Sequence, residues 1–168
     1  MYKRQVYEQR NAIQNDFSIG RYFINERKYC EMEDFAVMPD DLIVSCSGTL
    51  GKVAIVPEAV KPGVINQALL RIRVKKNKVM SLYLKYVLES VETQSKMTGI
   101  SHGTGLQNFP PMSEIRSLCV AVPPLSLQHE FARRVAAVDK LKAAHRASLT
   151  EIDALFTSLQ HRAFRGEL

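Results

Sequence analysis

The sequence predicts an α+β protein in two parts, a mainly antiparallel-sheet domain over residues 1–124 and one long C-terminal coiled-coil helix over residues 125–168. Two observations predict this division. Short apolar segments separated by turn residues, which are typical of strands, fill the chain as far as Pro124. Beyond Pro123 and Pro124 the chain contains neither proline nor glycine until Gly166, which favours a single uninterrupted helix.

Three segments of the first part are expected to form strands, at residues 42–44, 53–56 and 69–74. Residues 47–51 are rich in glycine and hydroxyl groups and should join the first two strands as a hairpin, while residues 39–41 form a turn before them. In the third strand Arg71 and Arg73 alternate with apolar residues. One face of that strand is therefore expected to be buried and the other to be basic.

One helix is expected to interrupt the sheet. Ser81 is a suitable N-terminal cap for it. After this serine, apolar residues recur at helical spacing at Leu82, Tyr83, Tyr86, Val87 and Val91. Residues 98–105 come next, and their glycine and hydroxyl content predicts an exposed loop.

The long helix carries a heptad pattern. Alternating spacings of four and three residues connect Phe131, Val135, Val138, Lys142, His145, Leu149, Ile152, Phe156, Leu159 and Ala163. This is the pattern of a coiled-coil seam. Lys142 and His145 either fix the register of a partner helix or extend their polar ends into water at a helix crossing. A helix over residues 125–164 would be about 60 Å long, and a second copy of the chain is the simplest source of a partner for it.

Composition limits the classes of function. A hydrophobic fraction of 46% and a charged fraction of 24% indicate a globular protein rather than a disordered one. No apolar run is long enough to cross a bilayer, so we expect a cytoplasmic protein. The three cysteines, Cys30, Cys46 and Cys119, are too widely spaced to suggest a zinc knuckle or a disulfide framework.

The net charge of +6 favours a polyanionic partner, because cationic side chains release counterions from a phosphate backbone. Five cations and no acid fall within residues 71–78, namely Arg71, Arg73, Lys75, Lys76 and Lys78. Such clustering is expected of a surface that contacts nucleic acid.

No catalytic motif is evident, so we expect a binding protein rather than an enzyme. Residues 48–52 have the order Gly-x-x-Gly-Lys, which is shorter than a phosphate-binding loop, and Val53 stands where that motif has Ser or Thr. No histidine pair has metal-ligand spacing. Asp40, Glu58 and Lys61 could form a magnesium-dependent nuclease centre, although the last two are three residues apart rather than two.

Five segments, in this order, resemble the specificity subunits of Type I restriction-modification systems. They are DLIVSCSGTLGKVAIVP at residues 41–57, INQALLRIR at 65–73, GTGLQNF at 103–109, VPPLSLQ at 122–128, and LFTSL with AFRGEL at 155–159 and 163–168. Each segment alone is weak evidence, whereas their common order makes the resemblance specific. It covers the chain from about Phe17 to the last residue.

The resemblance implies that residues 1–124 are a target-recognition domain for double-stranded DNA and that residues 125–168 are a spacer helix. Full-length members resemble two such units in tandem, so this chain is similar to one half. We expect it to form a homodimer through the helix and to recognise a bipartite palindrome. The domain lacks the stretch, often with a tryptophan, that usually opens it, so its N-terminal part is expected to be truncated or rearranged.

The resemblance also implies methyltransferase and restriction subunits as partners. Those subunits would hold S-adenosylmethionine, ATP and Mg²⁺, and no cofactor, metal or catalytic residue is expected in this chain. Two alternatives remain open. One is a truncated scaffold or decoy that binds no DNA, and the other is the magnesium-dependent nuclease.

Base reading requires donors and acceptors on exposed loops. We expect them at Ser47, Thr49 and Lys52 in the hairpin and at His102, Thr104, Gln107 and Asn108 in the later glycine-rich segment. Contacts to phosphates are expected from Arg71, Arg73 and Lys75.

Overall fold

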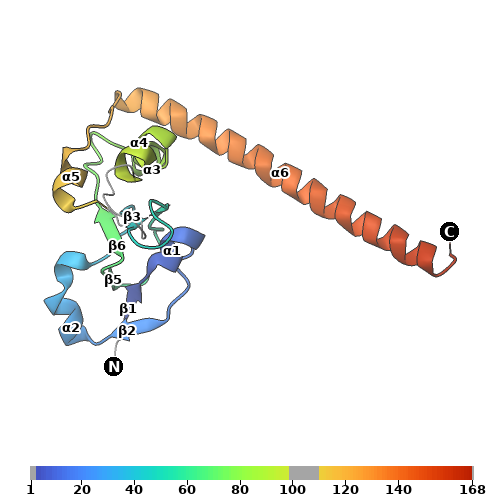
Figure 1. The fold of residues 1–168 in the computed structure, drawn as a ribbon, viewed down its shortest axis with the longest axis horizontal. Coiled ribbons are helices and arrows are strands. Elements are labelled where there is room, and N and C mark those ends of the chain that lie inside the picture. The colour runs from blue at the N-terminus through green and yellow to red at the C-terminus, as the bar shows by residue number, and fades with distance from the viewer. Residues whose placement is uncertain (1–2, 99–109, 168) are drawn as a thin grey trace. The chain divides into compact units, whose positions relative to one another are not determined.

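The structure is a computed structural model that describes residues 3–98 and 110–167 (Figure 1). It has the predicted α+β class, with antiparallel strand pairs and one long C-terminal helix. Contacts within the chain divide it into a first unit, Met1–Gln128, and a second unit, His129–Leu168. Among the described residues, no helix is both long enough and apolar enough to span a membrane.

The first sheet contains β1 (Arg4–Tyr7), β2 (Tyr22–Ile24) and β5 (Gly63–Ile65), in the order β2-β1-β5. The pairing of β1 with β2 is antiparallel, whereas β1 and β5 are parallel. Gly63 permits the close approach of these two strands, because a side chain at this position would overlap the carbonyl group of Gln5. This sheet was not predicted.

The second sheet confirms the predicted hairpin. It consists of β3 (Leu42–Ser45), β4 (Val53–Ile55) and β6 (Leu69–Ile72), in the order β4-β3-β6 with antiparallel pairing throughout. In its register Val44 lies opposite Val53 on one side and opposite Leu70 on the other. The predicted turn before β3 is present at residues 39–40.

Short helices surround the two sheets. They are α1 (Gln9–Gln14), α2 (Glu26–Glu31), the 3₁₀ turn η1 (Glu33–Phe35), α3 (Ser81–Leu88), α4 (Val91–Thr98) and α5 (Met112–Ser117). Local capping explains where α2 starts, because the Asn25 side chain accepts a hydrogen bond from the Lys28 backbone N–H at 2.8 Å.

The structure corrects the prediction for the helix after β6. Ser81 is not the cap, since Met80 occupies that position and Ser81 is the first helical residue, buried, with its hydroxyl donating to the Asp40 carbonyl at 2.9 Å. Val91 does not continue this helix. The Ser90 hydroxyl donates to the Val87 carbonyl at 2.7 Å and helps to end α3 there, so Val91 begins α4 and is exposed.

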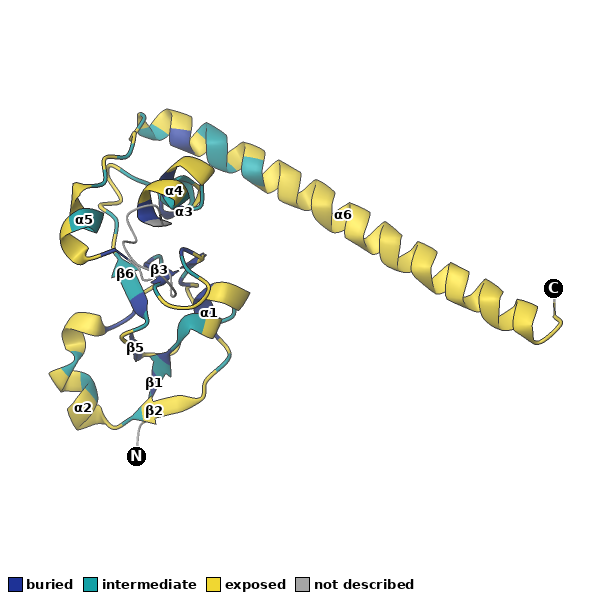
Figure 2. Cartoon of the chain, in the orientation of Figure 1, coloured by how far each residue is buried: buried dark blue, intermediate teal, exposed yellow. Residues whose placement is uncertain are grey.

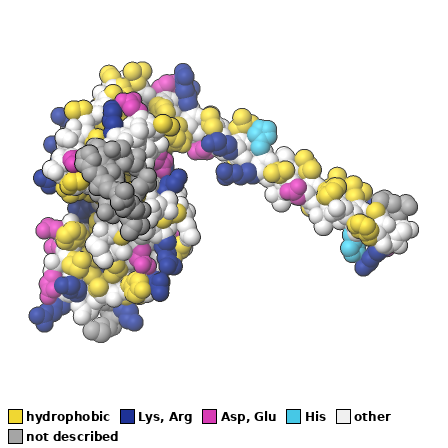
Figure 3. Space-filling view, viewed as in Figure 1, with side chains coloured by type: hydrophobic (Ala, Val, Ile, Leu, Met, Phe, Trp, Pro, Cys, Tyr) yellow, Lys and Arg dark blue, Asp and Glu magenta, His cyan; other side chains and the backbone are white. Residues whose placement is uncertain are grey.

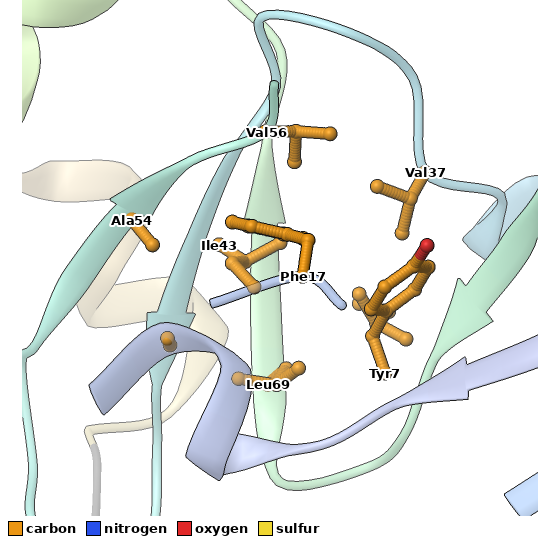
Figure 4. Close-up of a cluster of buried hydrophobic side chains, with 9 residues drawn as sticks. Tyr7, Phe17, Val37, Ile43, Ala54, Val56 and Leu69 are labelled. Atoms are coloured by element: carbon orange, nitrogen blue, oxygen red, sulfur yellow. The ribbon is translucent and has the colours of Figure 1, made fainter. Parts of the chain in front are cut away.

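Two hydrophobic clusters cover the two faces of the second sheet. The first includes Tyr7 and Phe17, whose ring centroids are 5.7 Å apart, together with Ile43 of β3 (Figure 4). The second includes Leu42 and Val44 of β3, and residues of α3 contribute to it. Because successive strand residues point to opposite faces, coverage on both sides leaves all four residues of β3 buried.

The long helix α6 (Leu125–Phe164) begins at the residue predicted from the sequence, directly after Pro124. Its first turn belongs to the first unit, where the Gln128 side chain is fully buried. The Gln128 carboxamide accepts a hydrogen bond from the Met80 N–H at 2.8 Å and donates to the carbonyls of Lys78 and Pro123 at 2.9 and 2.8 Å. All three contacts lie within the first unit.

The second unit consists of the rest of α6, and most of its residues are exposed (Figure 2). Hydrophobic side chains are visible along this helix in Figure 3. The predicted seam residues among the exposed ones are Val138, Lys142, His145, Leu149, Ile152, Phe156, Leu159 and Ala163. Leu141 and Leu155 are also exposed, fourteen residues apart and each next to a seam residue, so the apolar stripe is wider than the two-position seam.

Candidate nucleic-acid interface

The hairpin loop, residues 46–52, connects β3 to β4 and carries three of the predicted DNA-contacting residues. Ser47, Thr49 and Lys52 are all exposed on it. Gly48 and Gly51 adopt left-handed backbone conformations, with φ of 62° and 71°, that other residues rarely adopt. The structure therefore brings together two hydroxyl groups and one ammonium group on a short, tightly turned segment.

Ser45, the last residue of β3, makes three hydrogen bonds with the hairpin loop. Its buried hydroxyl donates to the carbonyl of Thr49 and accepts from the N–H of Lys52 at 3.0 Å. Its own carbonyl accepts from the N–H of Gly51 at 2.9 Å. The amides of Gly51 and Lys52 are thus engaged within the loop, whereas a phosphate-binding loop directs its amides at the ligand. This contact pattern argues against nucleotide binding here.

Two glutamines from helices that are distant in the sequence also donate hydrogen bonds to this loop. Gln9, the first residue of α1, donates from Nε2 to the carbonyl of Ser47. Gln94 of α4 donates from Nε2 to the carbonyl of Gly51 at 3.1 Å and to that of Leu88 at 2.6 Å. A side chain at position 51 would overlap the Gln94 carboxamide. Sequence reasoning missed both glutamines, because nothing local marks a contact across 38 or 43 residues.

The two arginines of the basic segment are already engaged within the first unit. The Arg73 guanidinium donates to both oxygens of Asp41, and the hydrogen bond raises the pKa of this arginine. Arg71 donates from Nη1 to the carbonyl of Ala36. Their contact with phosphates stays a prediction, and the side chain of Arg73 is still 44% exposed.

The face of β6 that was predicted to be basic carries Arg71 and, directly after the strand, Arg73, and it also contacts the core. Arg71 lies opposite Ile43 of β3 in the register. Ile43 is buried in the first hydrophobic cluster, and so is Leu69, which precedes Arg71 in β6. That face therefore contacts the core at Arg71, which is half-buried, whereas Arg73 remains exposed. The apolar face was predicted correctly, since Leu70 and Ile72 pack against the second cluster.

The lysines that follow β6 form the more accessible part of the basic segment. Lys75, Lys76 and Lys78 are exposed. The Lys76 ammonium lies 3.2 Å from the Asp40 carboxylate, but its side chain is 73% exposed, so this pair holds it only weakly. These three cations are available to a polyanion.

The predicted contact residues do not form one patch. Arg73 pairs with Asp41 at the start of β3, whereas the hairpin loop begins at the other end of the strand, after Ser45. Four residues of strand separate these points, roughly 14 Å. The candidate interface thus has two groups, the hairpin loop and the basic segment. His102, Thr104, Gln107 and Asn108 lie outside the described residues.

The nuclease residues do not gather into a metal centre. Within residues 3–98 and 110–167, no group of three His, Cys, Asp or Glu side chains is placed to hold a metal ion. Asp40 pairs with Lys76, and Glu58 and Lys61 are exposed. These contacts give the nuclease interpretation no support.

Comparison with known proteins places these features in a family context. The family model for the Type I restriction modification DNA specificity domain matches residues 7–154. The StySPI specificity subunit, from a Type I restriction enzyme of Salmonella potsdam, is 32% identical over 103 residues, which cover 59% of this chain and 22% of that protein. The EcoBI specificity subunit of Escherichia coli is 26% identical over 136 residues, covering 79% and 28%.

A solved structure has the same fold. One chain of a type I R-M system, from work on its complex assembly and conformational transition, superposes with a TM-score of 0.61 at 22% identity, covering 79% of this chain and 32% of that one. The chain described here thus spans less than a third of the length of the curated relatives it matches.

Proposed function

The chain belongs to the family of Type I restriction modification DNA specificity domains, and from this premise we propose that it reads the base sequence of double-stranded DNA and catalyses no reaction itself. The observation that carries the proposal is the hairpin loop, whose backbone is tied down while Ser47, Thr49 and Lys52 remain exposed. Hydroxyl and ammonium groups can donate to acceptors on base edges in the major groove.

The basic segment supplies the part of binding that does not depend on sequence. Lys75, Lys76 and Lys78 are exposed and carry charges suited to phosphates. Arg73 can add a phosphate contact only through the part of its guanidinium that Asp41 leaves accessible. His102, Thr104, Gln107 and Asn108 complete the set of proposed base contacts.

Two copies of the chain pair through α6 in this proposal. An exposed stripe that includes Leu149, Ile152 and Phe156 would lose its contact with water on pairing. A two-fold dimer presents the same reading surface twice with inverted sense, so its target would be a bipartite palindrome.

The catalytic partners in this proposal are methyltransferase and restriction subunits. They would bring S-adenosylmethionine, ATP and Mg²⁺, and this chain would direct them to the target site. The proposed compartment is the cytoplasm, where such subunits meet the DNA.

A gel-shift titration over a series of salt concentrations tests the proposal. Binding that falls steeply as salt rises is expected, because each phosphate contact releases a counterion. A triple variant with Ser in place of Lys75, Lys76 and Lys78 should bind DNA with an affinity that depends less steeply on salt. An absent or salt-independent shift would favour the alternative of a scaffold without DNA binding. Cleavage of a plasmid by the pure protein with Mg²⁺ would favour the nuclease.

A further inference from the structure

In the hairpin loop, alternate carbonyl groups accept hydrogen bonds from side chains. The carbonyls of Ser47, Thr49 and Gly51 accept hydrogen bonds from side chains of Gln9, Ser45 and Gln94, respectively. Successive fixed carbonyls on a tight turn define the path of the backbone between them. The loop is therefore held at three points by the surrounding fold, and its exposed side chains project from a fixed frame.

This fastening matters because the loop is otherwise easy to deform. Gly48 and Gly51 are glycines with positive φ, and an unrestrained segment of this kind has many accessible conformations. Ordering each backbone residue costs conformational entropy. A loop that is ordered before it binds avoids this cost at the interface, which raises affinity for the ligand that fits the ordered form.

We propose that Gln9 and Gln94 are positioning residues for sequence reading. They hold the hairpin loop in the one conformation that directs Ser47 and Thr49 at base edges, and they do so from α1 and α4 without touching the DNA. This inference rests on the proposed function. It assigns base discrimination, rather than general attraction to phosphates, to the two glutamines.

The geometry also separates the two roles in space. The glutamines act on the loop at the Ser45 end of β3, whereas Arg73 and the lysines after β6 lie toward its Leu42 end. Loosening the loop should therefore change recognition of the base sequence and leave the phosphate contacts of the basic segment intact. The affinity for a non-target duplex is the readout that distinguishes these cases.

Gln94→Met and Gln9→Met test the inference, because methionine keeps the length of the side chain and removes the donor. The matched control is Gln14→Met, since Gln14 is exposed at the end of α1. The probes are a duplex enriched by the wild-type chain from a random library and a scrambled duplex of the same composition. Gln94→Met and Gln9→Met should each bind the enriched duplex about tenfold more weakly than the wild type does, the equivalent of about 1.4 kcal/mol. Both should bind the scrambled duplex as the wild type does.

A second measurement distinguishes positioning from a general loss of stability. In a chain that carries Ser47→Ala and Thr49→Ala, the further change Gln94→Met should have almost no additional effect on discrimination, because the glutamine acts through those side chains. Hydrogen exchange of residues 45–52 should accelerate in Gln94→Met without a change in α6. If Gln94→Met does not fold, Gln9→Met carries the same test.

The outcomes separate this inference from the proposed function. If the wild-type chain enriches no sequence, the proposed function fails and the inference falls with it. If it enriches a sequence that Gln94→Met and Gln9→Met bind as tightly as the wild type does, or if both variants lose affinity equally for the enriched and scrambled duplexes, the positioning role alone is wrong. Unchanged hydrogen exchange in the loop would also contradict it.

Discussion

Arg73 holds the buried carboxylate of Asp41 with two hydrogen bonds, 2.7 Å from Nε to Oδ1 and 2.8 Å from Nη2 to Oδ2. The Asp41 side chain is 1% exposed, and it also accepts a hydrogen bond from the Met38 N–H at 2.9 Å. A carboxylate this deeply buried needs a charged partner. The pair therefore fixes the start of β3 against the end of β6, at the base of the basic segment.

Removing the arginine should destabilise the fold. Arg73→Leu leaves the Asp41 charge buried without its ion pair, and we expect a loss of about 3 kcal/mol in the free energy of unfolding, measured by urea denaturation. Arg73→Leu combined with Asp41→Asn should recover part of that loss, because the buried charge is gone. Arg27→Leu, at a 91% exposed side chain, is the control. A loss of less than about 1 kcal/mol in Arg73→Leu, as for an exposed ion pair, would contradict this role.

The Arg73–Asp41 pair also shows where sequence reasoning stops. The alternation of charge and apolar residues on β6 predicted the buried face correctly. It could not reveal that Arg73 forms an ion pair with the buried carboxylate of Asp41, 32 residues earlier in the sequence. A run of cations in a sequence does not distinguish a charge that faces water from one that neutralises a buried partner.

The same division applies to the whole fold. The β3–β4 hairpin and α6 were predictable because their patterns are local, a glycine-rich turn between apolar segments and a long heptad repeat. The strand β5 is three residues long and pairs in parallel with β1, almost sixty residues earlier in the chain. A strand this short has no alternation to recognise, and a parallel pairing leaves no local signal.

Gln128 should be necessary for the stability of the first unit. Gln128→Leu removes three hydrogen bonds to part-buried backbone groups, the N–H of Met80 and the carbonyls of Lys78 and Pro123. We expect a loss of roughly 3 kcal/mol in the free energy of unfolding, measured by urea denaturation. Gln14→Leu on the surface should change it by less than about 0.5 kcal/mol. Equal stability of the two variants would show that the Gln128 contacts contribute little.

Cys46 should react slowly with alkylating reagents. Burial raises the pKa of the Cys46 thiol from 9.0 to about 11, so at pH 8 its reactive thiolate fraction is about a hundredfold lower than without this shift. Mass spectrometry after iodoacetamide treatment at pH 8 should find Cys30 and Cys119, which are exposed, modified first. The Cys46 rate should rise about tenfold per pH unit between pH 8 and pH 10 and level off above a pH of about 11. Equal rates for the three cysteines at pH 8 would contradict the burial of this thiol.

The exposed stripe of α6 should mediate pairing of two chains. Leu149→Glu places a charge in the stripe, and sedimentation equilibrium at micromolar concentration should then find a monomer where the wild type is a dimer. Ala147→Glu is the matched control, because residue 147 lies on another face of the helix and should leave the dimer intact. A wild-type chain that sediments as a monomer would remove the basis for a two-fold reading unit.

Discrimination among DNA sequences by this chain is tested most directly by the ratio of two dissociation constants. One is for the duplex that the wild-type chain enriches from a random library, and the other is for its scrambled counterpart, both at physiological salt. A reader of base sequence should bind the first about a thousandfold more tightly. Equal affinity for the two duplexes would mean that the chain holds DNA by its phosphates alone and would contradict the account.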